Sequence, residues 1–313
     1  MEKKFMNAML IHIGTNLWYE VGNTKAPGPK VWQSPASESM RFDLTLFREL
    51  TETAAKKGVD TLVLDLADGI VYESHPELAI EGSLTRDVVK SEIERLSALG
   101  FEIIPKVNLS ACHDTWLKEY SKMVSTKIYY DVCRDVLHEV CDIFRPRYVH
   151  IGFDEENYEN QAGYDYVTVR QNELWWADLK FFAECVEECG ARACIWADYA
   201  RHKPEEFVEK CPRSIVACPW YYGNEFDLQS ISEFGRIRLT PYKILAEAGF
   251  DILGGASNEY HNESFEMQKR YLKDNIPKDQ LIGLIQTTWA ATTEEYRGFL
   301  FEAIDLIERA NGI

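Results

Sequence analysis

The sequence predicts an α/β fold, a single (β/α)8 TIM barrel over residues 1–313. Eight apolar, β-rich runs alternate with segments of helical periodicity, which is typical of this fold. The length of 313 residues suits one such barrel. An open doubly wound sheet is the alternative, and the lack of a Gly-rich dinucleotide loop after any predicted strand weakens it.

The predicted strands are apolar runs, several of which end in polar or aromatic residues. They are 9–16, 60–68, 101–109, 148–155, 192–200, 214–223, 251–258 and 281–290. Four intervening segments read clearly as helices. These are 42–58 and 84–100, each ending on a glycine, then 173–190 with one apolar stripe, and 292–312 at the end of the chain.

One long irregular segment interrupts this pattern. Residues 19–40 are rich in Pro, Gly and Ser, so we expect a loop insertion over the first strand-to-helix connection. The segment is either a lid or a plain surface loop. No second domain is predicted, and the sequence carries no signal for an oligomeric state.

Composition limits the possible partners. The formal net charge of −17 disfavours nucleic acid and an anionic membrane surface, because both require a basic face. No apolar stretch approaches the ~20 residues that span a bilayer. The first apolar run lacks a small-residue cleavage site, so we expect a strand rather than a signal peptide. The eight cysteines form no CxxC motif, which predicts reduced thiols and a cytoplasmic protein.

Catalytic and binding residues of such barrels lie at the C-terminal ends of the strands. The predicted strand ends carry acids, amides and aromatic rings, a combination that suits a sugar. They are Asn16, Trp18, Asp65, Asp68, Asn108, Asp154, Glu155, Trp196, Asp198, Trp220, Tyr221, Tyr222, Asn258, Glu259, Tyr260 and Trp289.

The fourth strand ends in three consecutive acids. Strand alternation directs His150 and Asp154 into the barrel, and the first of these is expected to be a hydrogen-bonded core histidine. The charge of Asp154 and partial burial should raise the pKa of Glu155, so that Glu155 stays protonated and can act as an acid. The third acid, Glu156, is expected to be solvated.

These residues carry a family resemblance. YVHIGFDEE (148–156) resembles the His-x-Gly-Gly-Asp-Glu signature of family-20 glycoside hydrolases, the β-N-acetylhexosaminidases, with Phe153 in place of the second glycine. The resemblance implies a retaining exo-hydrolase in which the substrate's own 2-acetamido oxygen is the nucleophile. It assigns Glu155 as the acid and Asp154 as the carboxylate that orients the acetamido group. It implies no cofactor and no metal.

The resemblance also implies a set of substrate-binding residues for a 2-acetamido sugar. They are Arg41, Asp68, His113, Trp196, Trp220, Tyr260, Asn262 and Trp289. The sequence departs from the family where Lys106, Asn108 and Asn262 replace acids, and where Ala290-Ala291 stands in place of a glutamate.

Two alternatives remain open. A sugar-binding barrel without catalysis, or with altered specificity, is suggested by Asn262 and Ala291. A metal-dependent sugar isomerase or hydrolase would use His150, Asp154, Glu155 and Asp198. The absence of a His-x-His or similar paired-ligand spacing weakens this second alternative.

Overall fold

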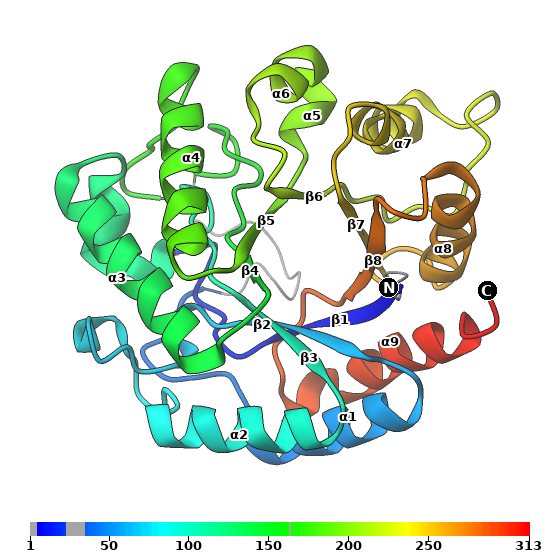
Figure 1. Cartoon of the computed structure of the whole chain (residues 1–313). Helices are drawn as coiled ribbons and strands as arrows, with labels where there is room; N and C mark the ends of the chain where they lie inside the picture. The colour runs from blue at the N-terminus through cyan, green and yellow to red at the C-terminus, as the bar shows by residue number, and fades with distance from the viewer. Residues whose placement is uncertain (1–4, 23–34, 163) are drawn as a thin grey trace.

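The computed structural model describes residues 5–22, 35–162 and 164–313 of the chain. Parallel strands in sequence order close into one barrel, which confirms the predicted fold class (Figure 1). The strands are β1 (Met6–His12), β2 (Thr61–Asp65), β3 (Glu102–Lys106), β4 (Tyr148–His150), β5 (Arg192–Trp196), β6 (Val216–Cys218), β7 (Ile252–Ser257) and β8 (Leu281–Thr287).

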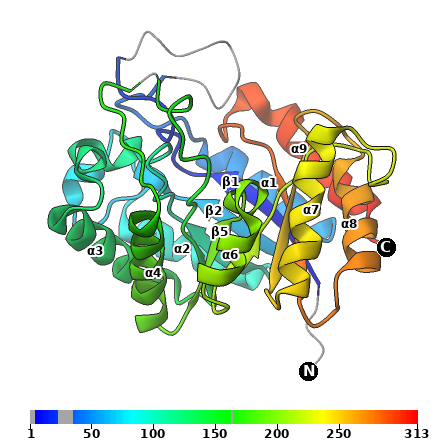
Figure 2. The same ribbon diagram turned by 90° about the horizontal axis from the view of Figure 1, so that it is seen from above.

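Helices follow every strand and surround the barrel (Figures 1 and 2). They are α1 (Leu44–Lys56), α2 (Arg86–Ala98), α3 (Lys127–Phe144), α4 (Glu173–Glu188), α5 (Tyr199–His202), α6 (Pro204–Lys210), α7 (Glu233–Glu247), α8 (Ser264–Asn275) and α9 (Arg297–Arg309). The first of them is capped by Asp43, whose carboxylate accepts hydrogen bonds from the backbone N–H groups of Thr45 and Leu46. Two short helices, α5 and α6, connect β5 to β6.

The strands bury side chains on both faces, as expected for a parallel barrel. The outer faces pack on the helices, and this layer includes Val149, Ile151 and Phe153, as strand alternation predicted. Apolar side chains also fill the barrel interior. A buried ion pair also lies in the interior, where Lys106 Nζ donates to Asp65 Oδ2 at 2.6 Å.

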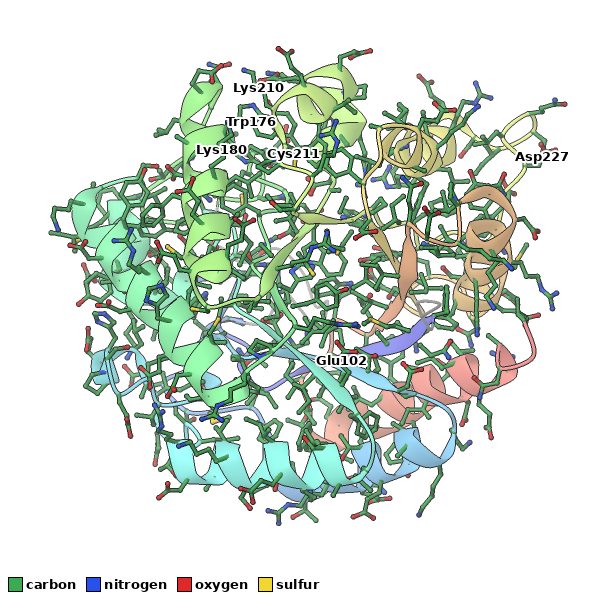
Figure 3. The ribbon with its side chains drawn as sticks, viewed as in Figure 1. Glu102, Trp176, Lys180, Lys210, Cys211 and Asp227 are labelled. Atoms are coloured by element: carbon green, nitrogen blue, oxygen red, sulfur yellow. The ribbon has the colours of Figure 1, made fainter. Side chains whose placement is uncertain are left out.

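The N-terminal end of the barrel carries partly exposed ion pairs. Arg147 donates from Nε and Nη2 to the two carboxylate oxygens of Glu102 at 2.9 and 3.0 Å (Glu102 is labelled in Figure 3). Arg192 Nη1 pairs with Asp251 Oδ2 at 2.6 Å. Solvated pairs of this kind contribute about 0–1 kcal/mol each to the free energy of unfolding.

The predicted insertion at 19–40 lies only partly within the described residues, since 23–34 are outside them. Asn16 holds the described end of the insertion at Ser37. Its Nδ2 donates to the Ser37 carbonyl at 2.6 Å, and its Oδ1 accepts the Ser37 N–H at 2.9 Å. Within the described ranges, no helix combines the length and apolar character that crossing a membrane requires.

Candidate functional site

A cavity of about 730 Å³ opens among the loops that follow the strands. It lies at the end of the barrel where catalytic sites of this fold occur. Seven of the ten residues predicted to be catalytic or substrate-binding line this cavity. They are His113, Asp154, Glu155, Trp196, Trp220, Tyr260 and Trp289.

The backbone after β4 turns both acids toward the cavity. The strand ends at His150, earlier than the predicted residue 155, because Gly152, Phe153 and Glu155 adopt left-handed φ angles of 73°, 74° and 56°. A Cβ atom at position 152 would lie 2.1 Å from Asn108 Oδ1, so glycine is required there. Left-handed residues other than glycine are strained, and such strain clusters at functional sites.

The phenylalanine in this turn has a structural reason. The Phe153 ring packs on Trp175 at a centroid distance of 5.0 Å, and the guanidinium carbon of Arg170 lies 4.3 Å from its centroid. These contacts offset the strain of a left-handed Phe, where the family signature has glycine. The Phe153 side chain therefore adds packing contacts on the outer side of the turn, and Asp154 and Glu155 still face the cavity.

Asp154 is the ionised member of the pair. Its carboxylate is buried and lies 3.4 Å from His113 Nδ1, and Asn108 Nδ2 donates to it at 3.3 Å. Burial alone would raise the pKa of Asp154. The charge and hydrogen bond of His113, the charge of Lys106 and the Asn108 amide together lower it to about 2. In return, Asp154 raises the pKa of His113 against the effect of burial.

Glu155 has the opposite electrostatic environment. Its Oε2 lies 3.8 Å from His113 Nε2, and its side chain is 40% exposed to the cavity. Desolvation raises the pKa of Glu155, and the neighbouring charge of Asp154 raises it further, although His113, Arg201 and Arg238 oppose the shift. The raised pKa confirms the direction predicted from the sequence. The pKa values of these two adjacent carboxyl groups are therefore shifted in opposite directions, that of Asp154 down and that of Glu155 up.

Asp198, a predicted strand-end residue, contacts the backbone of Glu155. Asp198 Oδ2 accepts the backbone N–H of Glu155 at 3.0 Å. Burial raises the pKa of Asp198 to about 7, helped by both acids and opposed by Arg201. Arg201 lies 3.6 Å above the Trp220 ring and donates to its carbonyl at 2.9 Å. The sequence had placed Asp198 among the strand-end residues that suit a sugar and as a possible metal ligand, and nothing in its spacing indicated this backbone contact.

Aromatic rings form the walls of the cavity. Trp196 lies 5.9 Å from Trp289, while Trp220 stacks on Tyr222 at 5.0 Å. Trp289 Nε1 donates to the hydroxyl of Tyr222 at 3.1 Å. The buried indole N–H of Trp196 has no acceptor among the described residues, so it is available to a ligand oxygen. Stacking faces combined with a few directed polar groups are typical of carbohydrate sites.

Three predicted binding residues are not among those lining this cavity. Arg41 lines a second cavity of about 370 Å³, which shares Trp18 and Trp289 with the first. Asp68 is buried and accepts a hydrogen bond from Asn16 at 2.6 Å; burial raises its pKa to about 7. Neither cavity is lined by Asp68 or Asn262.

Asn262 is exposed and donates to Glu302 Oε1 at 2.7 Å. It lies two residues beyond Tyr260, which is 57% exposed at the rim of the main cavity. Ala290 and Ala291 line the second cavity, where the family has a glutamate. The structure therefore separates Asn262 from the residues that surround Asp154 and Glu155.

The expectation that Glu156 is solvated is wrong. Its side chain is 3% exposed and forms an ion pair with Arg170, whose side chain is fully buried. Arg170 also donates to Asp178 Oδ2 at 3.0 Å and to the carbonyl of Leu109 at 2.7 Å. The Ala111 N–H donates to Glu156 Oε1 at 2.8 Å. This acid fastens the loop behind the cavity and does not face it.

The metal-binding alternative requires a different set of ligands from the one predicted. His150 is fully buried, accepts the Gly152 N–H at 3.1 Å through Nδ1, and packs on Trp196 at 4.5 Å, so it is a core histidine. Ligand atoms of His113, Asp154 and Glu155 lie within 4.8 Å of one another and could hold a metal ion. The histidine contributed to this group comes from the loop after β3 and not from β4.

The two acids after β4 and the surrounding tryptophans lie at one end of a closed barrel, and this barrel defines the class of fold. It is the fold of the catalytic barrel of family-20 glycoside hydrolases, which confirms the predicted resemblance at the level of fold. The β-N-acetylhexosaminidase of Streptomyces coelicolor matches 97% of this chain with a TM-score of 0.65 and 13% identity. That of Bacteroides fragilis matches 96% with a TM-score of 0.63 and 13% identity.

A third structure is the exo-β-N-acetylglucosaminidase of Vibrio harveyi in complex with N-acetylglucosamine. It matches 97% of this chain with a TM-score of 0.65 and 15% identity. The chain spans 63%, 64% and 54% of the lengths of these three proteins. No protein-family model matches the sequence, and no curated protein sequence does.

Proposed function

We propose that this protein is a retaining exo-glycoside hydrolase of the β-N-acetylhexosaminidase type, which removes terminal 2-acetamido sugars by substrate-assisted catalysis. One observation carries the proposal: two adjacent acids face an aromatic cavity, and their pKa values are shifted in opposite directions. Pairs of carboxyl groups whose environments separate their pKa values mark acid and base assignments in glycosidases.

In the first step the carbonyl oxygen of the substrate's acetamido group attacks the anomeric carbon, and the glycosidic C–O bond breaks. Glu155, whose pKa is raised by burial and by the charge of Asp154, gives its proton to the leaving oxygen. Asp154, ionised at a pKa of about 2, accepts the acetamido N–H and balances the positive charge that develops on the oxazolinium ring.

In the second step water adds to the anomeric carbon and opens the oxazolinium ring, which regenerates the acetamido group. Glu155, now ionised, accepts a proton from this water and is ready for another cycle. Two displacements at one carbon retain its configuration. His113 has a positioning role in this scheme, because it lies 3.4 Å from Asp154 and 3.8 Å from Glu155.

The rings and the unpaired indole N–H of Trp196 suit the apolar faces and oxygens of a sugar. Trp220, Tyr260 and Trp289 would bind the sugar itself, and the Tyr260 hydroxyl would hold the acetamido oxygen. The Vibrio harveyi protein, whose fold is similar, binds N-acetylglucosamine in its complex. We assign Arg41, which lines the adjoining cavity, as an outer contact of the substrate. Asp68 would support the site through its hydrogen bond with Asn16, and Asn262 would act only through its neighbours, since neither lines either cavity.

The compartment is part of the same proposal. Free cysteines at positions 112, 133, 141, 185, 189, 194, 211 and 218 suit a reducing environment, in line with the cytoplasmic location expected from the sequence.

A panel of aryl glycosides with and without a 2-acetamido group tests the proposal. We expect turnover of 2-acetamido substrates only, together with tight binding of a thiazoline analogue of the oxazolinium intermediate. Turnover of substrates that lack the acetamido group at equal rates would contradict the mechanism. Saturable sugar binding without turnover would instead identify the sugar-binding alternative.

The second candidate is a metal-dependent sugar enzyme, favoured by the proximity of His113, Asp154 and Glu155. In that case these residues would hold the ion, which would polarise a substrate oxygen. Activity that is lost on chelation and restored by a divalent cation would favour it, whereas activity in the presence of chelator favours the hydrolase proposed here.

A further inference from the structure

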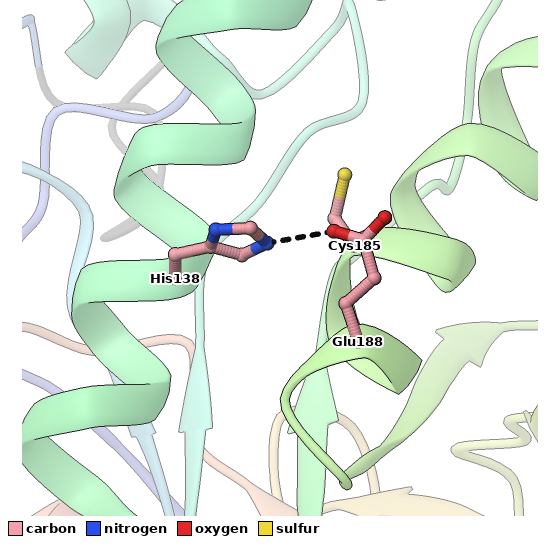
Figure 4. Close-up of side chains that lie close together, drawn as sticks. All are labelled: His138, Cys185 and Glu188. Carbon is pink, nitrogen blue, oxygen red and sulfur yellow. Dashed lines mark hydrogen bonds and ion pairs between the residues drawn. The ribbon is translucent and has the colours of Figure 1, made fainter.

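A second group of metal-binding side chains lies outside the barrel, between α3 and α4. His138 comes from α3, and Cys185 and Glu188 come from α4 (Figure 4). One ligand atom of each lies within 4.8 Å of the other two, and His138 Nε2 is 3.0 Å from Glu188 Oε2. Nitrogen, thiolate and carboxylate donors together suit Zn²⁺ and related transition-metal ions.

The helices hold these donors in a fixed register. Asp178 of α4 accepts hydrogen bonds from Ser125 Oγ at 2.7 Å and Tyr130 Oη at 2.5 Å. The ring of Tyr129 packs on Phe182 at a centroid distance of 6.0 Å. Because these contacts are buried or partly buried, α3 cannot slide along α4 without breaking them. The donors therefore meet on a rigid scaffold, which is the requirement for a precise metal site.

The site is also open to solvent and carries the right charge for a divalent cation. The side chains of His138 and Glu188 are 40% and 55% exposed, so an ion can enter from solvent. Cys185 is buried. A thiolate and a carboxylate neutralise a divalent cation. Burial raises the pKa of the Cys185 thiol, and the hydrogen bond and charge of Arg134 oppose that rise, so the thiol loses its proton when the metal binds.

Two more thiols lie close to this group. Cys189 lies directly after the end of α4, four residues beyond Cys185, and Cys141 follows His138 by three residues on α3. Cys141 shares a hydrogen bond with Cys189 and interacts electrostatically with Cys185. Zn²⁺ is commonly four-coordinate, and water can complete the shell.

The required adjustment is small. Zn–ligand bonds of ~2.0–2.3 Å at tetrahedral angles separate the ligand atoms by roughly 3.3–3.8 Å. Rotation of the exposed His138 and Glu188 side chains closes the remaining difference. We propose that His138, Cys185 and Glu188 form a binding site for Zn²⁺, or a divalent cation of the same class, that links α3 to α4.

Binding exchanges one proton for the metal: the S–H bond of Cys185 breaks, a Zn–S bond forms, and the proton leaves to solvent with no change of oxidation state. The full-length protein, freed of metal with a chelator, is titrated with Zn²⁺ by calorimetry, and with Co²⁺ as an optical probe of thiolate ligation. We expect one equivalent of Zn²⁺, a thiolate-to-cobalt charge-transfer band, and an increase in Tm with Zn²⁺.

Cys185→Ser and His138→Gln should each weaken Zn²⁺ binding more than about 100-fold, because losing even a residue that supports a ligand costs ~10–100-fold. The second variant changes a partly exposed side chain, so it keeps the test valid if burying a serine impairs folding. Two matched controls should bind normally. Cys211→Ser changes a buried thiol at the end of α6 (Figure 3). His75→Gln changes a histidine that pairs with two carboxylates and no thiol.

Glu155→Gln separates this site from the cavity and should also bind Zn²⁺ normally. Binding that is lost in Glu155→Gln but kept in Cys185→Ser would place the ion on His113, Asp154 and Glu155, and would overturn the proposal. Absence of saturable Zn²⁺ binding to the native chain would overturn it too.

Discussion

Consecutive acids after β4 occupy two different environments. Asp154 and Glu155 face the cavity and share the histidine His113, which lies within 3.8 Å of each carboxylate. Glu156 points the other way and pairs with Arg170, behind the cavity. The first two have pKa values moved in opposite directions, whereas the third is held by a cation that also binds Asp178 and the Leu109 carbonyl. Fully paired acids stabilise the loop, and incompletely paired ones are available for chemistry.

The largest expected effect is on the acid. Glu155→Gln should reduce turnover of substrates with poor leaving groups by ~10²–10⁴-fold, as loss of a general acid does. Aryl substrates with acidic phenols should be spared. The pKa of Glu155 is higher in the folded chain than in the unfolded chain. Ionisation of Glu155 therefore destabilises the folded state once the pH rises above the pKa that this residue has in the unfolded chain. The Tm of the variant at pH 7 should therefore equal or exceed that of the native chain. Equal rate losses on both substrate types would contradict the assignment.

Breaking the network behind the cavity should have the opposite pattern. Arg170→Met leaves Glu156 and Asp178 buried without their cation, and removing one partner of a buried ion pair costs about 3–5 kcal/mol. Denaturant unfolding should show this loss. Turnover per folded molecule should fall less than in Glu155→Gln. Unfolding that is unchanged within about 1 kcal/mol would show that the two environments do not differ as described.

The pH profile sharpens the contrast inside the cavity. Asp154, with a pKa of about 2, stays ionised over the working range, so the limb that matters belongs to the acid. Turnover should fall as pH rises through the raised pKa of Glu155, because its proton is lost. The residual activity of Glu155→Gln on activated aryl substrates should lack this alkaline limb. Persistence of the same limb in the variant would assign it to another group.

The smallest effect is expected at the N-terminal end of the barrel. Glu102→Gln removes half of a partly exposed pair with Arg147, and such pairs contribute about 0–1 kcal/mol. Unfolding free energy should change by no more than that, and turnover should not change. A larger stability loss than that of Arg170→Met would reverse the ranking of the two ends.

The sequence could predict the barrel and the two acids because both have local signals. Strand ends carry the chemistry in this fold, and the acids directly follow an apolar run. Arg170, the partner of Glu156, lies 14 residues further on in an irregular segment without periodicity. The ion pair between them could therefore not be predicted from the sequence. The contact between Asp198 and the Glu155 backbone depends on the left-handed φ angles of Gly152, Phe153 and Glu155. Of these three residues, only the glycine suggests such an angle in the sequence.

The spacing of Tyr260 and Asn262 illustrates the same limit. A two-residue interval after β7 suggested one shared site, yet the chain turns so that only the first lines the cavity. Arg238 reaches this cavity from α7, a helix that the strand-end argument does not include. Residues on strand ends were therefore predictable, and those supplied by turns and helices required the structure.

The central claim is that the substrate's acetamido oxygen is the nucleophile and that Asp154 acts through it. The most direct measurement is kcat/KM across substrates whose acetamido methyl carries zero, one, two or three fluorines, for the native chain and for Asp154→Asn. Fluorine withdraws electron density from the attacking oxygen, so the native rate should fall steeply along the series. Asp154→Asn should lower the rate on the parent substrate by ~10²–10³-fold, since it removes a preorganised electrostatic partner. A flat response of the native chain across the series, with measurable turnover, would contradict the account.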